Sequence, residues 1–236
     1  MGLYVDPGRA ELADEVLTWF VGVVAGAPAS VTVTVLDSET HLVAALQRAG
    51  YQPAESAPFF QHCVIDLDNV SAVPWLPAGY RIRAVRADEA EARAAAHRAA
   101  WQPARIGQLH VPPTDLGHAE SPVTTRSYEA VMNAWPYRHD LDQVVEAPDG
   151  TLVASALGWL DEANRSGELE PVGTEPRHAR RGLATAVSLA CLHALRTAGA
   201  TRAVVYPRGD SRYPAPRQLY RRLGFQPVAR TVTYTH

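Results

Sequence analysis

The segment from Glu168 to Ala184 constrains this chain most, because it passes from a β-strand through an arginine-rich turn into a long helix. The first backbone N–H groups of such a helix have no intrahelical partner, and the helix dipole adds positive potential, so an anion can bind there. Gly182 lets a bulky anion approach the backbone, and Arg180 and Arg181 supply positive charge. We therefore expect a turn that binds a phosphate group.

Two motifs in this half of the chain resemble a known family. Gly182 and Ala184 match motif A of the GNAT superfamily of acyl-CoA-dependent acyltransferases, although Ala179 stands where the family usually has Arg or Gln. Further on, Leu219–Phe225 reads Leu-Tyr-Arg-Arg-Leu-Gly-Phe and resembles the signature that closes the same fold. The resemblance covers roughly residues 80–236.

The resemblance implies an α/β (α+β) fold, with a mixed, mostly antiparallel, twisted sheet flanked by helices. Hydrophobic periodicity and turn residues predict a matching order of elements. Pro148-Asp149-Gly150 is a strong hairpin signal, and Gln102–Thr125 reads as a long polar loop. The expected elements are strand Tyr80–Arg86, helices Asp88–Trp101 and Thr125–Trp135, strands Leu141–Glu146, Thr151–Leu160 and Glu168–Thr174, helix Arg181–Arg196, strand Ala203–Tyr206, helix Pro216–Leu223 and strand Val228–Thr235.

The first seventy residues repeat the order of the last sixty. The expected elements are a helix over 11–25, strand Ser30–Leu36, helix His41–Ala49 and strand Phe59–Leu67. When Gly50 is aligned with Gly224, the flanking sequences also match, which indicates an internal repeat. In that alignment Leu46 replaces Tyr220, and the segment before the first helix lacks the phosphate-loop pattern.

This repeat predicts a tandem layout. Residues 1–70 are expected to form a degenerate, partial GNAT-like domain with a structural role. Residues 71–79, which contain Pro74 and Pro77, form the linker, and residues 80–236 form the catalytic domain.

The resemblance implies that the cofactor is acetyl-CoA, with the pantetheine arm in a gap where one strand splays from its neighbour. Pro171 lacks a backbone N–H and cannot hold a regular ladder position, so we expect a bulge there. Tyr213 stands where the family usually has an Asn that contacts the cofactor. The expected cofactor-binding residues are Val172, Gly173, Thr174, Ala179, Arg180, Arg181, Gly182, Leu183, Ala184, Thr185 and Tyr213.

Tyr220 is the candidate general acid for the leaving thiolate, by resemblance to the tyrosine of the family. Glu168 and Glu170 share one face of their strand, and Glu170 is the candidate base, acting through water. The alternatives are an aromatic side chain packed in the core and two ordinary surface carboxylates. Whether Glu168, Glu170 or water is the base stays open, because positioning of the reactants can itself supply much of the rate.

Three aromatic residues are candidates for an acceptor pocket, namely Trp101, Tyr128 and Trp135, with core packing as the alternative. None of the nine histidines has metal-ligand spacing, so no metal is expected.

Charge is distributed unevenly along the chain. Residues 176–236 contain eleven Arg and one acid, Asp210. This excess suits a phosphorylated cofactor better than nucleic acid, because no nucleic-acid-binding module is recognisable. The isolated Cys63 and Cys191, the acidic N-terminus and the short apolar runs predict a cytoplasmic protein without a membrane segment, and the Arg and Ala usage suggests a bacterial source.

Two functions are compatible with these features. The first is an N-acetyltransferase that moves an acetyl group from acetyl-CoA to the amine of a small molecule in a ternary complex. The alternative is a non-catalytic protein that binds acyl-CoA, which the Ala179 departure and the degenerate repeat favour. A monomer and a homodimer are both compatible with the sequence.

Overall fold

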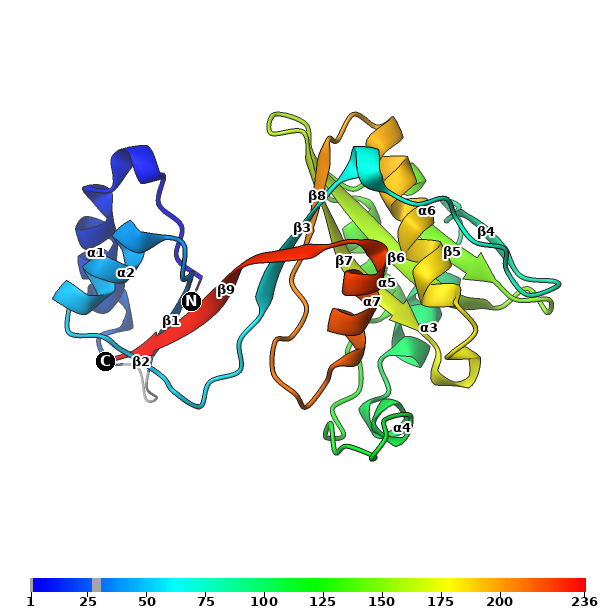
Figure 1. Cartoon of the computed structure of the whole chain (residues 1–236), viewed down its shortest axis with the longest axis horizontal. Coiled ribbons are helices and arrows are strands. Elements are labelled where there is room, and N and C mark those ends of the chain that lie inside the picture. The colour runs from blue at the N-terminus through cyan, green and yellow to red at the C-terminus, as the bar shows by residue number, and fades with distance from the viewer. Residues whose placement is uncertain (1, 27–30) are drawn as a thin grey trace. The chain divides into compact units, whose positions relative to one another are not determined.

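The computed structural model describes residues 2–26 and 31–236, and two compact units are distinguished in it (Figure 1). The first unit comprises residues 1–63, 206–210 and 227–236, and the second comprises residues 64–205 and 211–226. The chain leaves the first unit within β3 (Gln61–Asp66), after Cys63. The division proposed from the repeat, at residues 1–70, 71–79 and 80–236, stays a prediction.

The second unit is built on a mixed sheet. Neighbouring strands pair in the order β8-β7-β6-β5-β4, and all these pairs are antiparallel except β7 with β8, which is parallel. The turn after Ala147 closes the predicted hairpin, with Gly150 at φ +86°. The strands are β4 (Arg81–Ala84), β5 (Asp142–Glu146), β6 (Leu152–Asp161), β7 (Ser166–Thr174) and β8 (Arg202–Val205).

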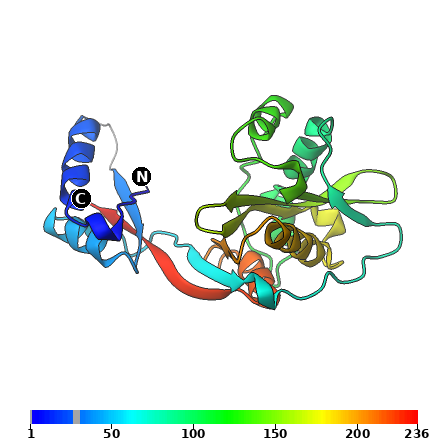
Figure 2. The same ribbon diagram turned by 90° about the horizontal axis from the view of Figure 1, so that it is seen from above.

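Helices cover both faces of this sheet (Figure 2). α6 packs so closely on one face that a Cβ on Gly167 would lie 2.7 Å from Cδ1 of Leu195. α3 lies against the other face and packs with α5. The helices are α3 (Ala90–Ala100), α4 (Pro103–Gln108), α5 (Thr125–Met132), α6 (Leu183–Thr197) and α7 (Ala215–Leu223). The predicted sheet flanked by helices is thus confirmed, whereas α4 lies in the segment that the sequence predicts to be a loop.

A buried ion pair fixes α3 to the sheet. Arg93 Nε donates to Asp142 over 3.0 Å, and both side chains are fully buried. Asp142 also accepts hydrogen bonds from the hydroxyl groups of Tyr128 and Tyr137. Loss of one partner would leave a buried charge uncompensated, which typically costs about 3–5 kcal/mol.

The first unit is a small α/β layer. β9 pairs antiparallel with β1 and with the short β2, and α1 and α2 bury their apolar faces with these strands in one hydrophobic cluster. The predicted strand Ser30–Leu36 corresponds to β1, and its residue Ser30 lies outside the described residues. The elements are α1 (Leu12–Val24), β1 (Thr32–Leu36), α2 (Thr40–Arg48), β2 (Gln52–Pro53) and β9 (Gln226–Thr235).

The same cap ends α2 and α7. Gly50 at φ +85° and Gly224 at φ +102° both follow the helix in the left-handed conformation. The next residue donates its N–H five positions back in each case, Tyr51 to Leu46 over 3.0 Å and Phe225 to Tyr220 over 3.0 Å. These are matching Schellman caps. The structure therefore supports the alignment of Leu46 with Tyr220.

None of the described helices is both long and apolar enough to cross a membrane.

Gly224→Ala should lower the free energy of unfolding by about 1–2 kcal/mol, because a Cβ is strained in the left-handed conformation. Gly22→Ala should instead raise it by about 0.5–1 kcal/mol, because Gly22 lies inside α1 with no atom within 4 Å of the new Cβ. Urea unfolding followed by circular dichroism would measure both. Equal effects of the two substitutions would contradict the assigned cap.

Candidate functional site

β7 (Ser166–Thr174) extends well beyond its pairing with β8 (Arg202–Val205). Their parallel pairing runs from Ser166 with Arg202 to Glu168 with Val204 and then stops, although β7 continues to Thr174. The β8 side of β7 is therefore an open strand edge after Glu168. We call this open edge the splay, because it lies in the strand for which the sequence resemblance implies a gap beside its neighbour.

The open edge presents backbone groups of alternate residues. Glu175 N–H donates to the carbonyl of Val153 over 2.8 Å, so the backbone of Glu175 faces β6. Because successive residues of a strand alternate in direction, the N–H and C=O groups of Val172 and Thr174 face the splay and those of Gly173 face β6. Thr174 Oγ1 is also buried and has no hydrogen-bond partner among the described residues.

β7 carries a bulge at the predicted position. The register with β6 shifts between Ala156 and Gly158, so Glu170 and Pro171 together oppose the single residue Leu157. The predicted irregularity at Pro171 is confirmed. Because the bulge adds one residue, Glu170 and Pro171 lie on the same face of the sheet.

Gly173 permits a close approach of α3 to this strand. A Cβ at Gly173 would lie 2.8 Å from Cβ of Ala100 and 3.6 Å from the indole ring of Trp101. Trp101 is 39% exposed and stacks on His97 with ring centroids 5.1 Å apart. Of the three predicted acceptor-binding residues, Trp101 is the one placed beside the splay.

The other two predicted acceptor residues lie elsewhere. Tyr128 is 3% exposed, and its hydroxyl is bound to Asp142 beneath α3, so its environment favours core packing. Trp135 follows α5 and is 93% exposed. No described contact joins either side chain to β7.

The turn before α6 presents a row of free donors. The hydrogen bonds of the described residues include none from the backbone N–H groups of residues 180–185, and Gly182 at the N-cap position offers no side-chain cap. Arg180 at φ +61° and Gly182 at φ +78° both adopt the left-handed conformation, which turns the chain sharply here. Such a concave array of N–H groups at a helix start fits a phosphate. The predicted residues Ala179, Arg181, Leu183, Ala184 and Thr185 belong to this turn.

Groups from other segments of the chain bind the side chains of the two arginines. Arg180 donates to the carbonyl of Leu109 in the segment after α4, and Arg181 donates to the hydroxyl of Tyr80 over 2.8 Å. The same hydroxyl is 2.9 Å from Nδ1 of His178. Tyr80 was not among the predicted site residues, because it precedes β4 and no local pattern links it to a turn a hundred residues away.

α1 offers an internal comparison for this turn. α6 begins Leu183-Ala184-Thr185 after Gly182, whereas α1 begins Leu12-Ala13-Asp14 after Glu11. Carboxylates thus occupy the start of α1, where they interact favourably with the helix dipole, and they are paired with arginines, Glu11 with Arg9 and Asp14 with Arg48. This supports the expectation that the first repeat lacks a phosphate site.

Tyr220 lies on α7 beside the splay. Its side chain is 7% exposed, packs edge-on against Phe225, and its hydroxyl makes no hydrogen bond to a described residue. Burial raises the pKa of the Tyr220 phenol, and the nearby Glu170, Tyr213 and Cys191 raise it further. Tyr220 therefore remains protonated at neutral pH and can donate a hydrogen bond to a ligand.

Tyr213 belongs to the same neighbourhood. Its ring stacks on that of His110, with centroids 5.6 Å apart, and burial raises the pKa of its phenol. His110 lies in the segment after α4, and its Nε2 is buried without a partner among the described residues. The segment after α4 therefore contacts both the phosphate turn, through Arg180, and Tyr213.

Glu168 and Glu170 point to the same face of β7, as predicted. Neither carboxylate forms an ion pair or a hydrogen bond with a described residue. Burial raises the pKa of Glu168; burial and the neighbouring Glu168 raise the pKa of Glu170, although part of its side chain remains exposed. A carboxylate with a raised pKa is a stronger base than an ordinary glutamate.

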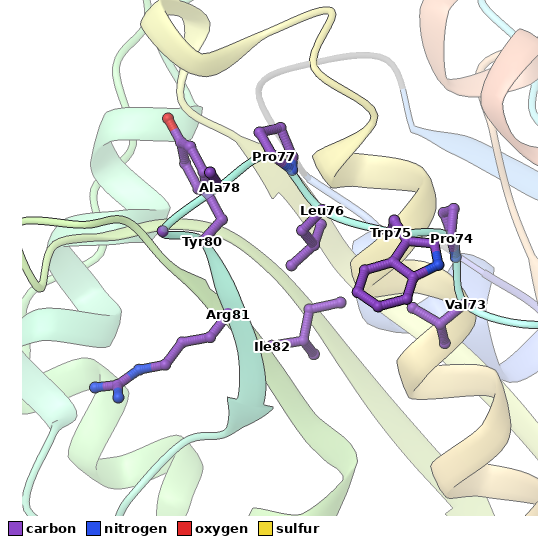
Figure 3. Close-up of a pocket in the computed structure, with 10 residues that line it drawn as sticks. Val73, Pro74, Trp75, Leu76, Pro77, Ala78, Tyr80, Arg81 and Ile82 are labelled. Atoms are coloured by element: carbon purple, nitrogen blue, oxygen red, sulfur yellow. The ribbon is translucent and has the colours of Figure 1, made fainter.

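A separate hollow of about 530 Å³ lies along Val73–Ile82 (Figure 3). Its lining contains Leu76 and Ile82, whose side chains lie next to each other, while Arg81 points away from them. No carboxylate, histidine or cysteine lines it. We therefore place the candidate chemistry at the splay. Among the described residues, no group of three or more His, Cys, Asp or Glu side chains could hold a metal ion.

Comparison with known proteins supports the fold. Residues 149–234 match the model of a GNAT-related family described as FR47-like protein. No curated protein sequence matches the chain.

Solved structures resemble the whole chain. A GCN5-related N-acetyltransferase from Sphaerobacter thermophilus is 23% identical with a TM-score of 0.67, over 100% of this chain and 71% of that one. A GCN5-related N-acetyltransferase from Kribbella flavida is 19% identical with a TM-score of 0.60, over 100% and 77%. A tandem GNAT protein from the clavulanic acid biosynthesis pathway, solved without AcCoA, is 16% identical with a TM-score of 0.66, over 99% and 73%. The predicted GNAT fold is thus confirmed.

Thr185→Asp, which gives α6 the acidic start of α1, should raise the Kd for coenzyme A by about tenfold or more, equivalent to about 1.4 kcal/mol. It should leave thermal stability equal or slightly higher, because an acid favours a helix start. Thr185→Asn has a similar size without the charge and serves as the control. Isothermal calorimetry and thermal unfolding measure the two effects. Unchanged affinity in the aspartate variant would contradict a phosphate site at this turn.

Proposed function

We propose that this protein, which has the fold of the GCN5-related N-acetyltransferases, transfers an acetyl group from acetyl-CoA to the amine of a small-molecule acceptor in a ternary complex. The observation that carries the proposal is the row of unpaired N–H groups at the start of α6, because a helix start of this kind suits a diphosphate. The open edge of β7 continues the same site.

The residues around the splay fit the parts of coenzyme A. Residues 180–185 would hold the diphosphate through backbone N–H groups, with Arg180 and Arg181 adding positive charge. Val172 and Thr174 would pair with the amides of the pantetheine arm, as an added strand would. The orphaned Thr174 Oγ1 offers one further polar group. Bound acetyl-CoA supplies the activated acetyl thioester.

Tyr220 would act on the leaving group. When the acceptor nitrogen forms its bond to the acetyl carbon, the carbon–sulfur bond breaks and negative charge develops on sulfur. The Tyr220 phenol is protonated, nearly buried and without a hydrogen-bond partner among the described residues, so it can donate to that sulfur. Its partial burial strengthens this hydrogen bond.

Glu170 would accept, through water, the proton that the acceptor nitrogen loses, either from an ammonium before the attack or from a neutral amine as the nitrogen–carbon bond forms. Its raised pKa lies closer to neutrality than that of an exposed glutamate, which favours proton transfer. Glu168 lies on the same face and stabilises the positive charge of an approaching ammonium.

The charge of this face favours particular acceptors. Two unpaired carboxylates attract a cationic amine and repel an acceptor that carries a carboxylate next to its amino group. Trp101 supplies a partly exposed aromatic wall beside Gly173, suited to a cation or an apolar group. We therefore infer that amines without an adjacent carboxylate are better acceptors than α-amino acids.

The second candidate function is a non-catalytic protein that binds acyl-CoA. Ala179 in place of Arg or Gln, and the acidic start of α1, favour this alternative. A thiol-release assay with a panel of diamines, amino sugars, aryl amines and amino acids discriminates the two. Turnover with any amine supports the enzyme, whereas tight binding of coenzyme A without turnover on the whole panel supports the binding protein.

Tyr220→Phe should lower kcat by about 10²-fold, because the proton donor is lost while the ring still packs against Phe225. The Kd for coenzyme A should stay within about twofold of the unmodified protein, since the phosphate contacts lie elsewhere. Tyr234→Phe, at a buried tyrosine of the first unit, is the control. Full activity of the Tyr220→Phe variant would contradict the role of Tyr220 as the proton donor to the leaving thiolate.

Activity should rise with pH through the pKa of Glu170, because only the deprotonated carboxylate accepts a proton. Since the folded environment raises this pKa, the acidic limb of the kcat profile should lie above the ordinary glutamate value of 4.5. An aryl amine is the suitable acceptor, because it is already neutral in this range. Glu170→Gln should abolish the acidic limb of the kcat profile and lower its plateau by about tenfold. This loss is smaller than the usual contribution of a general base, because water can accept the proton instead. An acidic limb at the same pH in the unmodified protein and in the Glu170→Gln variant would show that another group causes it.

A further inference from the structure

The bulge in β7 leaves a backbone group that the strand ladder does not satisfy. Glu170 and Pro171 together face one residue of β6, and Pro171 has no N–H to donate. The carbonyl of Glu170 instead accepts a hydrogen bond from Nε1 of Trp159, over 2.7 Å. A side chain of β6 thus replaces the missing ladder contact.

The indole that makes this bond lies on the same face as the two candidate carboxylates. Trp159 is the direct cross-strand partner of Glu168, so both side chains lie on one face of the sheet, and Glu170 is two residues further along β7. The indole therefore spans the strand pair at the point where β7 leaves β8.

The indole is itself held by a rigid neighbour. Its ring packs edge-on against Tyr137, with centroids 6.3 Å apart and planes at 69°. The Tyr137 hydroxyl donates to Asp142 over 3.1 Å, and Asp142 is paired with the buried Arg93. Through these contacts the buried ion pair beneath α3 limits the movement of the bulge.

We propose that Trp159 is a positioning residue, which fixes the bulge and so holds the Glu170 carboxylate at the splay. The proposal rests on the proposed function, because it assigns Trp159 an effect on the candidate base. Trp159 acts through the Glu170 backbone and does not contact the reacting atoms. The loss of its N–H should therefore affect proton transfer more than cofactor binding.

Trp159→Phe removes the N–H and keeps an aromatic ring against Tyr137. We expect kcat to fall by about tenfold and the KM for acetyl-CoA to change less than twofold. Trp75→Phe, at a fully exposed indole, is the matched control and should change neither.

The double variant Trp159→Phe/Glu170→Gln tests the route of the effect. If Trp159 acts through Glu170, the double variant should have the same kcat as Glu170→Gln alone, since two residues that act as a unit are not additive. If Trp159→Phe lowers kcat equally whether or not the carboxylate is present, the proposal is overturned.

A titration that needs no turnover separates this proposal from the proposed function. The carboxyl carbon of Glu170 can be followed by NMR as pH is varied, with Glu168 on β7 and Tyr220 on α7 as the neighbouring ionisable groups. Trp159→Phe should lower the pKa of Glu170 toward its ordinary value, because a loosened bulge admits water to the carboxylate. An unchanged pKa would overturn the positioning role even in an active enzyme. Lack of turnover in the unmodified protein, with the pKa shift present, would overturn only the proposed function.

The hydrogen bond can also be measured without a substitution at the site. The indole N–H of Trp159 should exchange with solvent much more slowly than that of the exposed Trp75. Assignment of the indole signals by the two phenylalanine variants makes the comparison direct. Equally fast exchange would remove the contact on which the proposal depends, even if Trp159→Phe folds poorly.

Discussion

The end of the pairing between β7 and β8 after Glu168 is the constraint on which the site depends. A parallel pair that continued to Thr174 would use the backbone groups of Val172 and Thr174 in its own ladder. Because the pairing stops, these groups are available, and the turn into α6 lies at the end of the same opening. The bulge belongs to this arrangement, since it puts Pro171 on the same face of the sheet as Glu170 at this point of β7. The fold thus exposes one strand edge and one helix start together. The side chains around them, Tyr220 and Glu170 among them, are the candidates for the chemistry.

Much of this could be predicted from local patterns. Gly182 before a long helical run predicts a sharp turn at the start of a helix, and Pro171 within a strand predicts a bulge. The structure has both features. Gly50 and Gly224, each followed by an aromatic residue, predicted two matching helix ends for the same reason. The confirmed order of strands and helices follows from such signals, because turns and caps depend on nearby residues.

Long-range contacts could not be predicted in this way. Tyr80 binds Arg181, and Arg180 binds the carbonyl of Leu109, and in neither case does sequence spacing indicate the partner. Tyr128 has the aromatic character expected of an acceptor pocket, but the buried charge of Asp142 holds its hydroxyl in the core. α4 was missed because its six residues include Pro and Gly, and its hydrophobic pattern is too short to recognise. The site therefore combines a predictable backbone with side-chain neighbours that only the tertiary fold defines.

The uncapped start of α6 also makes the protein's own stability depend on its surroundings. The first turn of α1 contains the carboxylates of Asp14 and Glu15, whereas the first turn of α6 contains no acidic residue, so under the proposed function a bound diphosphate would supply the negative charge there. A ligand that binds only the folded state adds stability by mass action, about 2.7 kcal/mol when present at a hundred times its Kd. In a cell with little of this ligand, the second unit would unfold locally more often and become more susceptible to proteolysis. The stability of the first unit, whose α1 carries its own carboxylates, would not depend on the ligand concentration. Supply of the ligand would then set the lifetime of the protein as well as its occupancy.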